Sequence, residues 1–566
     1  MNEINRLPSK AEVQPILENF SKGEFAQAKN LSLSLYAKYP NAIFLLNILG
    51  LCSLNLAKSD EAETFLRKAY KIAPDNFETC SNLGLILQQI GKYEEAEPFL
   101  QSAIKINSSI PQLHFNLGLT QEALKLYEQA IKSYDEAARL KPDFGQAFFN
   151  KGLIEWKLKS YEMALVCLKR AKKLISPEDP LILASIGGVY KEMLDYSSAE
   201  EYTLAALKIR EEPKFFFNLA TIKRDQGNIS GAKDLYEKII GIDANFPEAF
   251  NNLGEIYRDL GDSDKAKKMF EKALVIKPNM NKPNYNLALL HQDSENYLEA
   301  ANYFEKSQIE DWLAKVCYCY YKDSNFENFE KYLSLAIKRK HWSPLIASIT
   351  NHFEINHKRE NSYNFCAKPF EFIRKESIEI LKNNSSFKNE LLRDLQNSEI
   401  GVRKQGRLIN GIQSAGNLLK RSENSLKVLA GHILVEVDNY VSAFEGEANE
   451  FIQSFPKIPL FQSSWYVKMN KGGHLTPHIH ETAWLSGVLY LKLPKGQSPE
   501  MEGMIEFGYD GDGYPKADIQ NESKIIAIEE GDILLFPSSL FHRTIPFETD
   551  EDRICIAFDI APPPTP

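Results

Sequence analysis

Small and hydrophobic residues recur along residues 9–314 with a period of 34 positions. Nine segments align with one another and begin near residues 9, 43, 77, 111, 145, 180, 213, 247 and 281, with one step of 35 residues and one of 33. The eighth position is usually glycine, and the twentieth is alanine in all nine segments: Ala28, Ala62, Ala96, Ala130, Ala164, Ala199, Ala232, Ala266 and Ala300. Small residues at these positions let two antiparallel helices cross closely. Each segment therefore predicts one pair of helices.

This pattern resembles the tetratricopeptide-repeat family. The resemblance implies an all-α superhelical solenoid of about nine repeats over residues 9–314. Residues 315–345 echo the period weakly and are expected to be a degenerate repeat whose helices cap the solenoid. Residues 346–430 lose the period and predict a helical connector, with short amphipathic helices at Phe370–Leu381 and Lys388–Leu395 and an irregular stretch at Gly401–Asn417.

In six repeats an asparagine directly precedes the seventh and eighth positions, which are commonly Leu-Gly: Asn82, Asn116, Asn150, Asn218, Asn252 and Asn286. Inside a helix each asparagine costs up to ~0.7 kcal/mol relative to alanine. The row resembles the asparagine ladder of O-linked N-acetylglucosamine transferase, whose repeats hold an extended peptide in their concave groove. The resemblance implies that a peptide or protein binds the concave face of the repeats. The alternative is that repeat duplication spread one amide without a binding role.

After about residue 430 the pattern changes to short runs of β-branched and aromatic residues separated by Gly- and Asp-containing turns. The predicted strands include Ile433–Val437, Trp465–Met469, Ser486–Leu493, Ile533–Phe536 and Ile554–Ile560. Several short strands with such turns favour a sandwich or jelly roll. Residues 431–566 are therefore expected to form an all-β domain, so that the whole chain is a multidomain protein with an α-solenoid followed by a β-domain.

Composition adds few constraints to this picture. The chain of 566 residues has 43% hydrophobic and 25% charged residues and a net charge of -9, and this mild acidity argues against a nucleic-acid partner. The sequence lacks the ~18 consecutive apolar residues of a membrane span. The polar N-terminus lacks the apolar run of a signal peptide. The seven cysteines show no paired spacing and predict reduced, buried thiols. A cytoplasmic protein without a membrane partner is expected.

Three histidines of the predicted β-domain have the spacing of a metal site. His478 and His480 lie just ahead of a strand, and alternate residues of an extended chain share one face, so both rings can reach one ion. His542 follows a strand that ends in a turn, where a third ligand can reach the same point. Arg553 opens the last strand, eleven residues beyond His542. His474 is expected to be a loop residue and not a ligand.

This arrangement resembles the iron(II)- and 2-oxoglutarate-dependent dioxygenases, in particular a bacterial and phage branch. The matching elements, which cover about residues 460–562, are Trp465, His478, His480, Leu485–Leu491, Gly531–Asp532, Phe536–Pro537, His542 and Arg553. The resemblance implies a double-stranded β-helix in which the histidines are the catalytic metal ligands. It also implies the cofactors Fe²⁺, 2-oxoglutarate and O₂, with Arg553 binding the far carboxylate of 2-oxoglutarate. Two alternatives stay open for Tyr490 and Tyr466: a hydrogen bond to this cosubstrate, or a place among the core aromatic residues.

The sequence departs from the family pattern at the second ligand. Most members have His-x-Asp/Glu there, whereas this chain has His480. Three alternatives stay open: a site of three histidines, recruitment of Glu481 through a bulge, or only two protein ligands. The alternation of side chains along a strand favours His480.

The leading functional hypothesis is a dioxygenase that hydroxylates a peptide or protein brought by the repeats. One alternative is a non-enzymatic interaction scaffold with a degenerate oxygenase-like domain, since repeats of this kind are commonly binding modules. Another is a cupin-like enzyme that uses a different metal, such as zinc, because three neutral ligands leave more positive charge on the ion.

Overall fold

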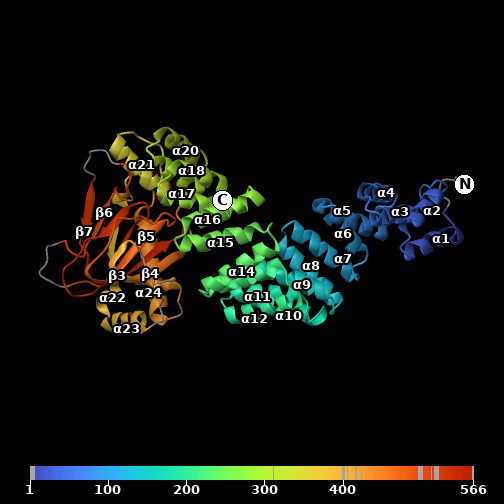
Figure 1. Cartoon of the computed structure of the whole chain (residues 1–566), viewed down its shortest axis with the longest axis horizontal. Coiled ribbons are helices and arrows are strands. Elements are labelled where there is room, and N and C mark those ends of the chain that lie inside the picture. The colour runs from blue at the N-terminus through green and yellow to red at the C-terminus, as the bar shows by residue number, and fades with distance from the viewer. Residues whose placement is uncertain are drawn as a thin grey trace. The chain divides into compact units, whose positions relative to one another are not determined.

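The computed structural model describes residues 7–309, 311–397, 402–403, 406–414, 417–421, 423–494, 501–511, 513–515 and 522–563. The chain divides into two compact units, residues 1–256 and residues 257–566, and each is described by itself. The helices and strands carry the labels of Figure 1.

The first unit consists of helix pairs, in which each odd-numbered helix packs on the even-numbered helix that follows it. Its helices, including α15, which runs on into the second unit, are α1 (Lys10–Ser21), α2 (Phe25–Tyr36), α3 (Ile43–Asn55), α4 (Ser59–Ile72), α5 (Phe77–Gln89), α6 (Tyr93–Ile106), α7 (Pro111–Ala123), α8 (Tyr127–Leu140), α9 (Gly145–Lys157), α10 (Tyr161–Leu174), α11 (Pro180–Glu192), α12 (Tyr196–Ile209), α13 (Pro213–Asp225), α14 (Ile229–Ile242) and α15 (Pro247–Asp259).

The small residues of the repeat lie where the two helices of a pair cross. All nine alanines at the twentieth position are completely buried. The glycine at the eighth position leaves no space for a side chain. At Gly118, for example, an added Cβ would lie 2.6 Å from the ring of Tyr134 in the second helix of the pair. The 34-residue period is therefore a consequence of close helix crossing.

A pair of glycine variants tests this packing. Gly118→Ala is expected to lower the free energy of unfolding by about 1–3 kcal/mol, because the methyl group overlaps the buried Tyr134 ring. Gly241→Ala in α14 is expected to raise it by about 0.5–1 kcal/mol, since its added Cβ meets no atom within 4 Å and alanine favours the helix. Amide hydrogen exchange of α7, α8 and α14 measures both changes. Equal protection of α7 in Gly118→Ala and in the native protein would contradict this packing.

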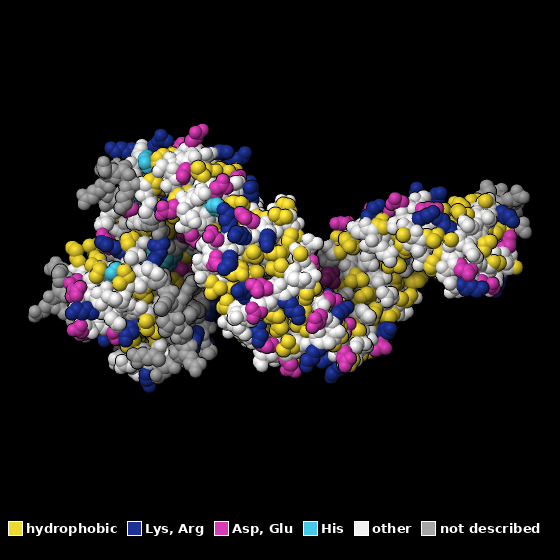
Figure 2. Space-filling model, viewed as in Figure 1, with side chains coloured by type: hydrophobic (Ala, Val, Ile, Leu, Met, Phe, Trp, Pro, Cys, Tyr) yellow, Lys and Arg dark blue, Asp and Glu magenta, His cyan; other side chains and the backbone are white. Residues whose placement is uncertain are grey.

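The surface of the repeats carries both signs of charge. On the face shown in Figure 2, acidic and basic side chains are interspersed over the first unit, with hydrophobic side chains among them. The absence of a nucleic-acid partner stays a prediction. Within the described ranges, no helix combines the length and the apolar character that crossing a membrane requires.

The second unit begins with the last repeats and their cap: α16 (Ser263–Ile276), α17 (Asn281–Asp293), α18 (Tyr297–Ser307), α19 (Trp312–Lys322), α20 (Phe326–Lys338) and α21 (Pro344–His357). Helices α19 to α21 share one hydrophobic core with the β-domain. Buried members of this core include Tyr321 and Phe353 from the helices and Trp484 and Phe558 from the β-domain. The apolar end of the solenoid is thus covered by the β-domain and the connector.

The connector contains both helices and strands: η2 (Pro369–Phe372), β1 (Arg374–Ser377), α22 (Glu379–Asn383), α23 (Ser385–Asn397), β2 (Val402–Arg403), β3 (Leu408–Ser414) and η3 (Leu418–Lys420). The predicted helix Lys388–Leu395 lies within α23. The predicted helix Phe370–Leu381 is wrong in its middle, because residues 374–377 pair with β8 as an edge strand. The predicted irregular stretch also contains β3, which pairs with β4. Both strands exist through long-range pairing, which local pattern does not show.

The strand predicted at Ile433–Val437 is wrong. These residues belong to α24 (Asn424–Ala443), which precedes the short α25 (Glu450–Gln453). The buried positions of α24 follow a helical period and include Leu426, Leu429, Ile433, Val437 and Tyr440. The run of β-branched residues at 433–437 is therefore only the part of a helical stripe that looks like a strand.

The described residues of the β-domain form seven further strands: β4 (Phe461–Leu475), β5 (Leu485–Lys492), β6 (Ile505–Gly508), β7 (Ser523–Ile526), β8 (Asp532–Pro537), β9 (Phe541–Thr544) and β10 (Arg553–Ile560). The larger sheet has the order β1-β8-β5-β10-β4-β3-β2, the smaller one β7-β6-β9, and all their pairs are antiparallel.

An isolated bridge places His478 beside His542 at the edge of the smaller sheet. The strand orders of the two sheets show that, from β4 onward, the chain crosses repeatedly between them, as in a double-sheet jelly roll. Residues of both sheets, among them Tyr490 and Phe507, meet in one buried cluster. The predicted repeat solenoid followed by a C-terminal region of antiparallel sheets is confirmed, and the double-stranded β-helix stays a prediction.

Candidate metal centre

The backbone of the β-domain brings His478 and His542 together. His542 lies in β9, and His478 lies in the segment between β4 and β5. Each donates its backbone N–H to the carbonyl of the other, at 3.1 and 3.0 Å. The backbone N–H of His480 donates to the carbonyl of Ser538 at 3.1 Å, which fixes the next turn of the same segment. Backbone hydrogen bonds between these segments therefore set the positions of all three histidines.

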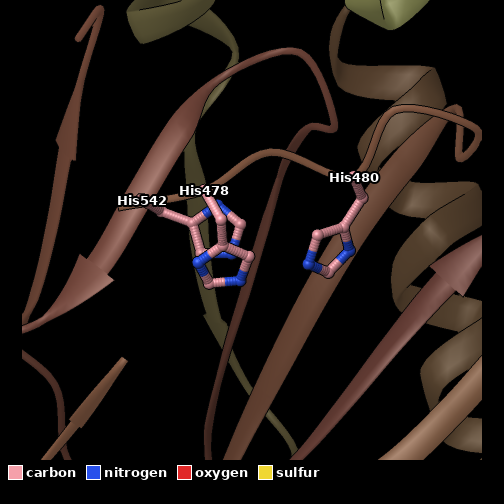
Figure 3. A group of neighbouring side chains, drawn as sticks. All are labelled: His478, His480 and His542. Atoms are coloured by element: carbon pink, nitrogen blue, oxygen red, sulfur yellow. The ribbon is translucent and has the colours of Figure 1, made fainter. Parts of the chain in front are cut away.

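The three imidazole rings converge on one point. The ring centroids lie 4.3 Å apart for His478 and His542, 5.4 Å for His478 and His480, and 5.1 Å for His480 and His542. One nitrogen from each ring lies within 4.8 Å of the other two, so the group can hold a metal ion. In Figure 3 the rings of His478 and His542 lie close together from facing segments, and the ring of His480 points toward them from across the site.

Hydrogen bonds determine which nitrogen of each ring faces the centre. Nδ1 of His478 lies 2.8 Å from the carbonyl oxygen of Thr476, and Nδ1 of His542 lies 3.2 Å from that of Leu540. A carbonyl oxygen only accepts, so these Nδ1 atoms carry the proton and donate. The Nε2 atoms are then left with free lone pairs, which is the usual state of histidines that bind metals.

The electrostatics of the site keep two of these rings neutral. Burial, together with the neighbouring His480 and Arg407, lowers the pKa of His478 to about 3. Burial and the two other histidines hold the pKa of His542 well below its ordinary value. A lowered pKa leaves the imidazole unprotonated at neutral pH. Both rings are therefore ready to donate a lone pair to a cation.

The third ring is supported by a carboxylate. Nδ1 of His480 lies 2.5 Å from Oδ1 of Asp559 in β10, and the hydroxyl of Ser486 in β5 donates to the same carboxylate oxygen at 2.8 Å. The sequence pattern included Ser486 only as part of a strand motif and missed Asp559. The one feature of the sequence that pointed to Asp559 is its even spacing from Arg553 along the last strand, because such a spacing places both side chains on one face.

Glu481, the alternative third ligand, points away from the histidines. Its carboxylate pairs with Nζ of Lys315 in α19 at 2.5 Å. His474 also lies outside the group, in β4, with its Nδ1 on the carbonyl of Gly472. The described geometry therefore favours His480 as the third donor.

Substitution of Glu481 distinguishes the two candidates. Glu481→Gln is expected to leave the affinity for Mn²⁺ unchanged, because the amide keeps a hydrogen bond near Lys315 and no metal donor is removed. His480→Gln is expected to weaken Mn²⁺ binding strongly. Titration calorimetry of both variants measures the difference. Loss of Mn²⁺ binding in Glu481→Gln at unchanged thermal stability would show that Glu481 is a ligand.

The histidines line a pocket together with residues of both sheets. Arg553 and Tyr490 line it together with Trp465. Arg553 is 2% exposed. Its guanidinium donates to the carbonyl of Gly503 at 3.0 Å and lies 5.1 Å from the centre of the Tyr490 ring. Among the described residues no carboxylate pairs with it. A buried charge without a counter-ion is costly, so this side chain is suited to an anionic ligand.

Tyr490 offers a second unsatisfied group in this pocket. Within the described part of the chain no acceptor lies within hydrogen-bond geometry of its buried hydroxyl, and the nearby charged group is the Arg553 guanidinium, which lies over its ring. Burial raises the pKa of this hydroxyl, which therefore keeps its proton and can donate. Tyr466 packs on the other hydrophobic core and does not line the pocket. Of the two tyrosines considered from the sequence, the structure brings only Tyr490 to the site.

Asp532 of the Gly-Asp motif has a structural role. Its carboxylate accepts from the hydroxyl of Ser377 at 3.0 Å and from the backbone N–H of Glu529 at 2.8 Å, and it pairs with Lys382 at 2.9 Å. These contacts tie β1 and α22 of the connector to the start of β8. The motif therefore fixes the connector on the β-domain and does not touch the metal centre.

The six asparagines of the repeats all lie in the first helix of their pairs. Asn116, Asn252 and Asn286 are buried, and the other three are half-buried. Several of their amides already contact other side chains: Asn82 donates to Asn47 at 3.3 Å, Asn252 donates to the hydroxyl of Tyr236 at 3.0 Å, and Asn286 accepts from Arg258 at 2.9 Å. These bonds brace neighbouring helices, which is a role that the sequence pattern did not indicate.

Comparison with protein families locates the two kinds of domain. A family model described as Putative 2OG-Fe(II) oxygenase matches residues 463–559. Models described as Tetratricopeptide repeat match residues 45–76, 81–143, 112–174, 213–246 and 247–280. A comparison with curated proteins found no match.

Parts of the chain are also similar to solved structures. These include a crystal structure of MamA (21% identity, 28% of this chain and 93% of that chain, TM-score 0.28). A second is YrrB, described as a TPR protein with an unusual peptide-binding site (20% identity, 35% and 97%, TM-score 0.28). A third is the APC/C hetero-tetramer Cut9-Hcn1 (16% identity, 47% and 52%, TM-score 0.35). On the family matches, the chain carries tetratricopeptide repeats followed by a C-terminal domain, residues 463–559, of the Putative 2OG-Fe(II) oxygenase family.

Proposed function

We propose that the C-terminal domain is an iron(II)- and 2-oxoglutarate-dependent dioxygenase and that its substrate is a peptide or protein bound by the repeats. One observation carries the proposal. Three imidazoles with free Nε2 lone pairs and a buried guanidinium that no carboxylate of the described residues pairs with line the same pocket. A divalent cation and a dicarboxylate satisfy these two unmet requirements together.

The residues present suit this pair of ligands. Nε2 of His478, His480 and His542 would hold Fe²⁺. Arg553 would hold the far carboxylate of 2-oxoglutarate through charge-assisted hydrogen bonds, and Tyr490 would donate a further one. With both bound, the reaction uses O₂ to oxidise 2-oxoglutarate to succinate and CO₂ and places one oxygen atom into a C–H bond of the substrate.

The protein's own residues position the bound ligands and shield them from water. The lining around the histidines is largely apolar and includes Trp465, Val488 and Phe536. Such walls exclude water and strengthen the attraction between Arg553 and a carboxylate, because the local dielectric is low. The hydrogen bonds on the three Nδ1 atoms keep the rings oriented before any metal arrives.

A protein or peptide substrate is proposed from the repeats. Side chains that face a groove and offer amide groups can bind the backbone of an extended peptide, and Asn82, Asn150 and Asn218 stay half-exposed in the first unit. Of these three, Asn82 already donates to Asn47 at 3.3 Å, and such a bond limits the side-chain entropy lost on binding.

Release of succinate tests the proposed function. Full-length protein is loaded with Fe²⁺ and 2-oxoglutarate without oxygen, and O₂ is then admitted. Succinate that forms only when all three are present supports the dioxygenase. A protein that binds no metal and no 2-oxoglutarate, yet captures a partner through its repeats, would be a scaffold. A protein that is purified with zinc and produces no succinate would be an enzyme of another kind or none.

A further inference from the structure

The third metal donor, His480, differs from the other two in what supports it. Nδ1 of His478 and Nδ1 of His542 face neutral backbone carbonyls, whereas Nδ1 of His480 faces the carboxylate of Asp559 at 2.5 Å. The position of His480 is the one that carries Asp or Glu in the family pattern described above. A carboxylate, that of Asp559, is thus present near the three histidines, but it contacts the ring of His480 and does not belong to the group of donors itself.

Asp559 is held for this contact by the two strands that flank β10. In the sheet register Asp559 lies opposite Ser463 of β4 on one side and opposite Ser486 of β5 on the other. The hydroxyl of Ser463 donates to Oδ2 at 2.9 Å, and that of Ser486 donates to Oδ1 at 2.8 Å. Two cross-strand hydrogen bonds therefore point the carboxylate at the His480 ring.

The negative charge of Asp559 has no other counterpart. The side chain is buried, at 6% exposure, and among the described residues it pairs with no lysine or arginine. A divalent cation held by three neutral imidazoles in an apolar pocket also lacks a compensating charge, which makes its transfer from water costly. A carboxylate hydrogen-bonded to one ligand reduces this cost and makes that imidazole a better donor.

We propose that Asp559 is a positioning residue that acts through His480, turning the Nε2 atom of His480 toward the metal and supplying the charge that a carboxylate ligand supplies elsewhere in the family. The proposal rests on the proposed function, since it requires a metal at the three histidines. It also gives β10 two roles. Arg553, which lines the pocket, and Asp559, which contacts His480, lie on the same face of this strand.

The affinity for Mn²⁺, measured by calorimetry on the full-length protein, tests this role without relying on turnover. Asp559→Asn is expected to weaken Mn²⁺ binding by about 10–100-fold, the usual cost of losing an outer partner of a histidine ligand. The matched control is Asp532→Asn. Asp532 is also buried and also accepts a hydrogen bond from a distant serine, Ser377, but it does not contact the histidines. This control is expected to change stability and leave the Mn²⁺ affinity unchanged.

Two further measurements separate a positioning role from a merely structural one. The visible absorption bands of bound Co²⁺ report the field of its ligands and are expected to shift in Asp559→Asn but not in Asp532→Asn. If Asp559 acts through His480, the effect of Asp559→Asn on Mn²⁺ affinity is also expected to be smaller in a His480→Asp background than in the native protein.

Milder variants keep the test decisive if Asp559→Asn does not fold. Ser463→Ala removes one hydrogen bond that orients Asp559 and is expected to weaken Mn²⁺ binding, whereas Ser377→Ala, which removes the corresponding bond to Asp532, is not. If the Asp559 and Ser463 variants keep the native Mn²⁺ affinity and the native Co²⁺ spectrum, the role assigned to Asp559 is wrong and the proposed function is unaffected. Failure of the native protein itself to bind Mn²⁺ would instead overturn the proposed function.

Discussion

His542→Ala is expected to abolish metal binding and, with it, the formation of succinate. His542 supplies one of three donors, and its ring is nearly buried, so no solvent-exposed side chain can take its place. The loss in Mn²⁺ affinity should exceed the about 10–100-fold that removal of an outer hydrogen-bond partner costs. The β9 backbone, which makes the bridge to His478, does not depend on the side chain. Calorimetry with Mn²⁺ and metal analysis after anaerobic loading measure the change.

The control for this variant is His474→Ala. His474 lies close in sequence to His478, but its Nδ1 bonds to the carbonyl of Gly472 and it stands outside the three-histidine group. Native metal binding is expected in this variant. If His542→Ala bound Mn²⁺ as tightly as the native protein, the metal would have to lie elsewhere, and the site described here would be wrong.

Arg553→Gln is expected to remove the binding of 2-oxoglutarate and to spare the binding of the metal. Each charge-assisted hydrogen bond to a carboxylate contributes about 1.5–3 kcal/mol, so the loss of one corresponds to about 10–150-fold in affinity. The variant removes a buried charge that lacks an anionic partner, so the free energy of unfolding of the ligand-free protein is not expected to fall by as much. Titration of 2-oxoglutarate into Mn²⁺-loaded protein measures the change.

Arg374→Gln is the matched control for this second variant. Arg374 lies in the edge strand β1 of the same sheet, but it is half-buried and already pairs with Glu376. Its loss should leave the affinity for 2-oxoglutarate unchanged. Retained 2-oxoglutarate binding in Arg553→Gln would contradict the assignment of Arg553 as the carboxylate anchor.

The repeats could be predicted from the sequence because their cause is local and is repeated nine times. A helix pair crosses only where small residues stand, and the spacing of Ala28, Ala62 and their equivalents records that crossing directly. The errors lie where packing across the chain decides the structure. Residues 374–377 became a strand because β8 offers an open edge, and residues 433–437 became part of a helix because the stripe from Leu426 to Tyr440 faces the core.

The grouping of three histidines was predictable from the sequence, but their environment was not. His478, His480 and His542 stand out by spacing, and alternation along an extended chain already favoured His480 over Glu481. Their assignment as ligands stays a prediction, as do the peptide-binding role of the asparagines and the domain boundaries. Asp559 and Lys315 could not be found in the same way. They meet His480 and Glu481 only after folding, from 79 and 166 residues away.

The structure also alters the interpretation of the asparagine row. From the sequence, six amides at one repeat position predicted a surface for a peptide. In the fold, Asn252 and Asn286 are buried and serve neighbouring side chains of the solenoid. Part of the cost of placing asparagine in a helix is thus offset within the protein itself. A peptide-binding role rests mainly on the half-exposed members.

A structure of the full-length protein with Mn²⁺ and an unreactive analogue of 2-oxoglutarate tests the metal centre most directly. We expect one ion bound by Nε2 of His478, His480 and His542, and an analogue whose far carboxylate pairs with Arg553. An ion bound elsewhere, an ion that displaces His480 in favour of Glu481, or an analogue whose carboxylate lies away from Arg553 would contradict the proposed site.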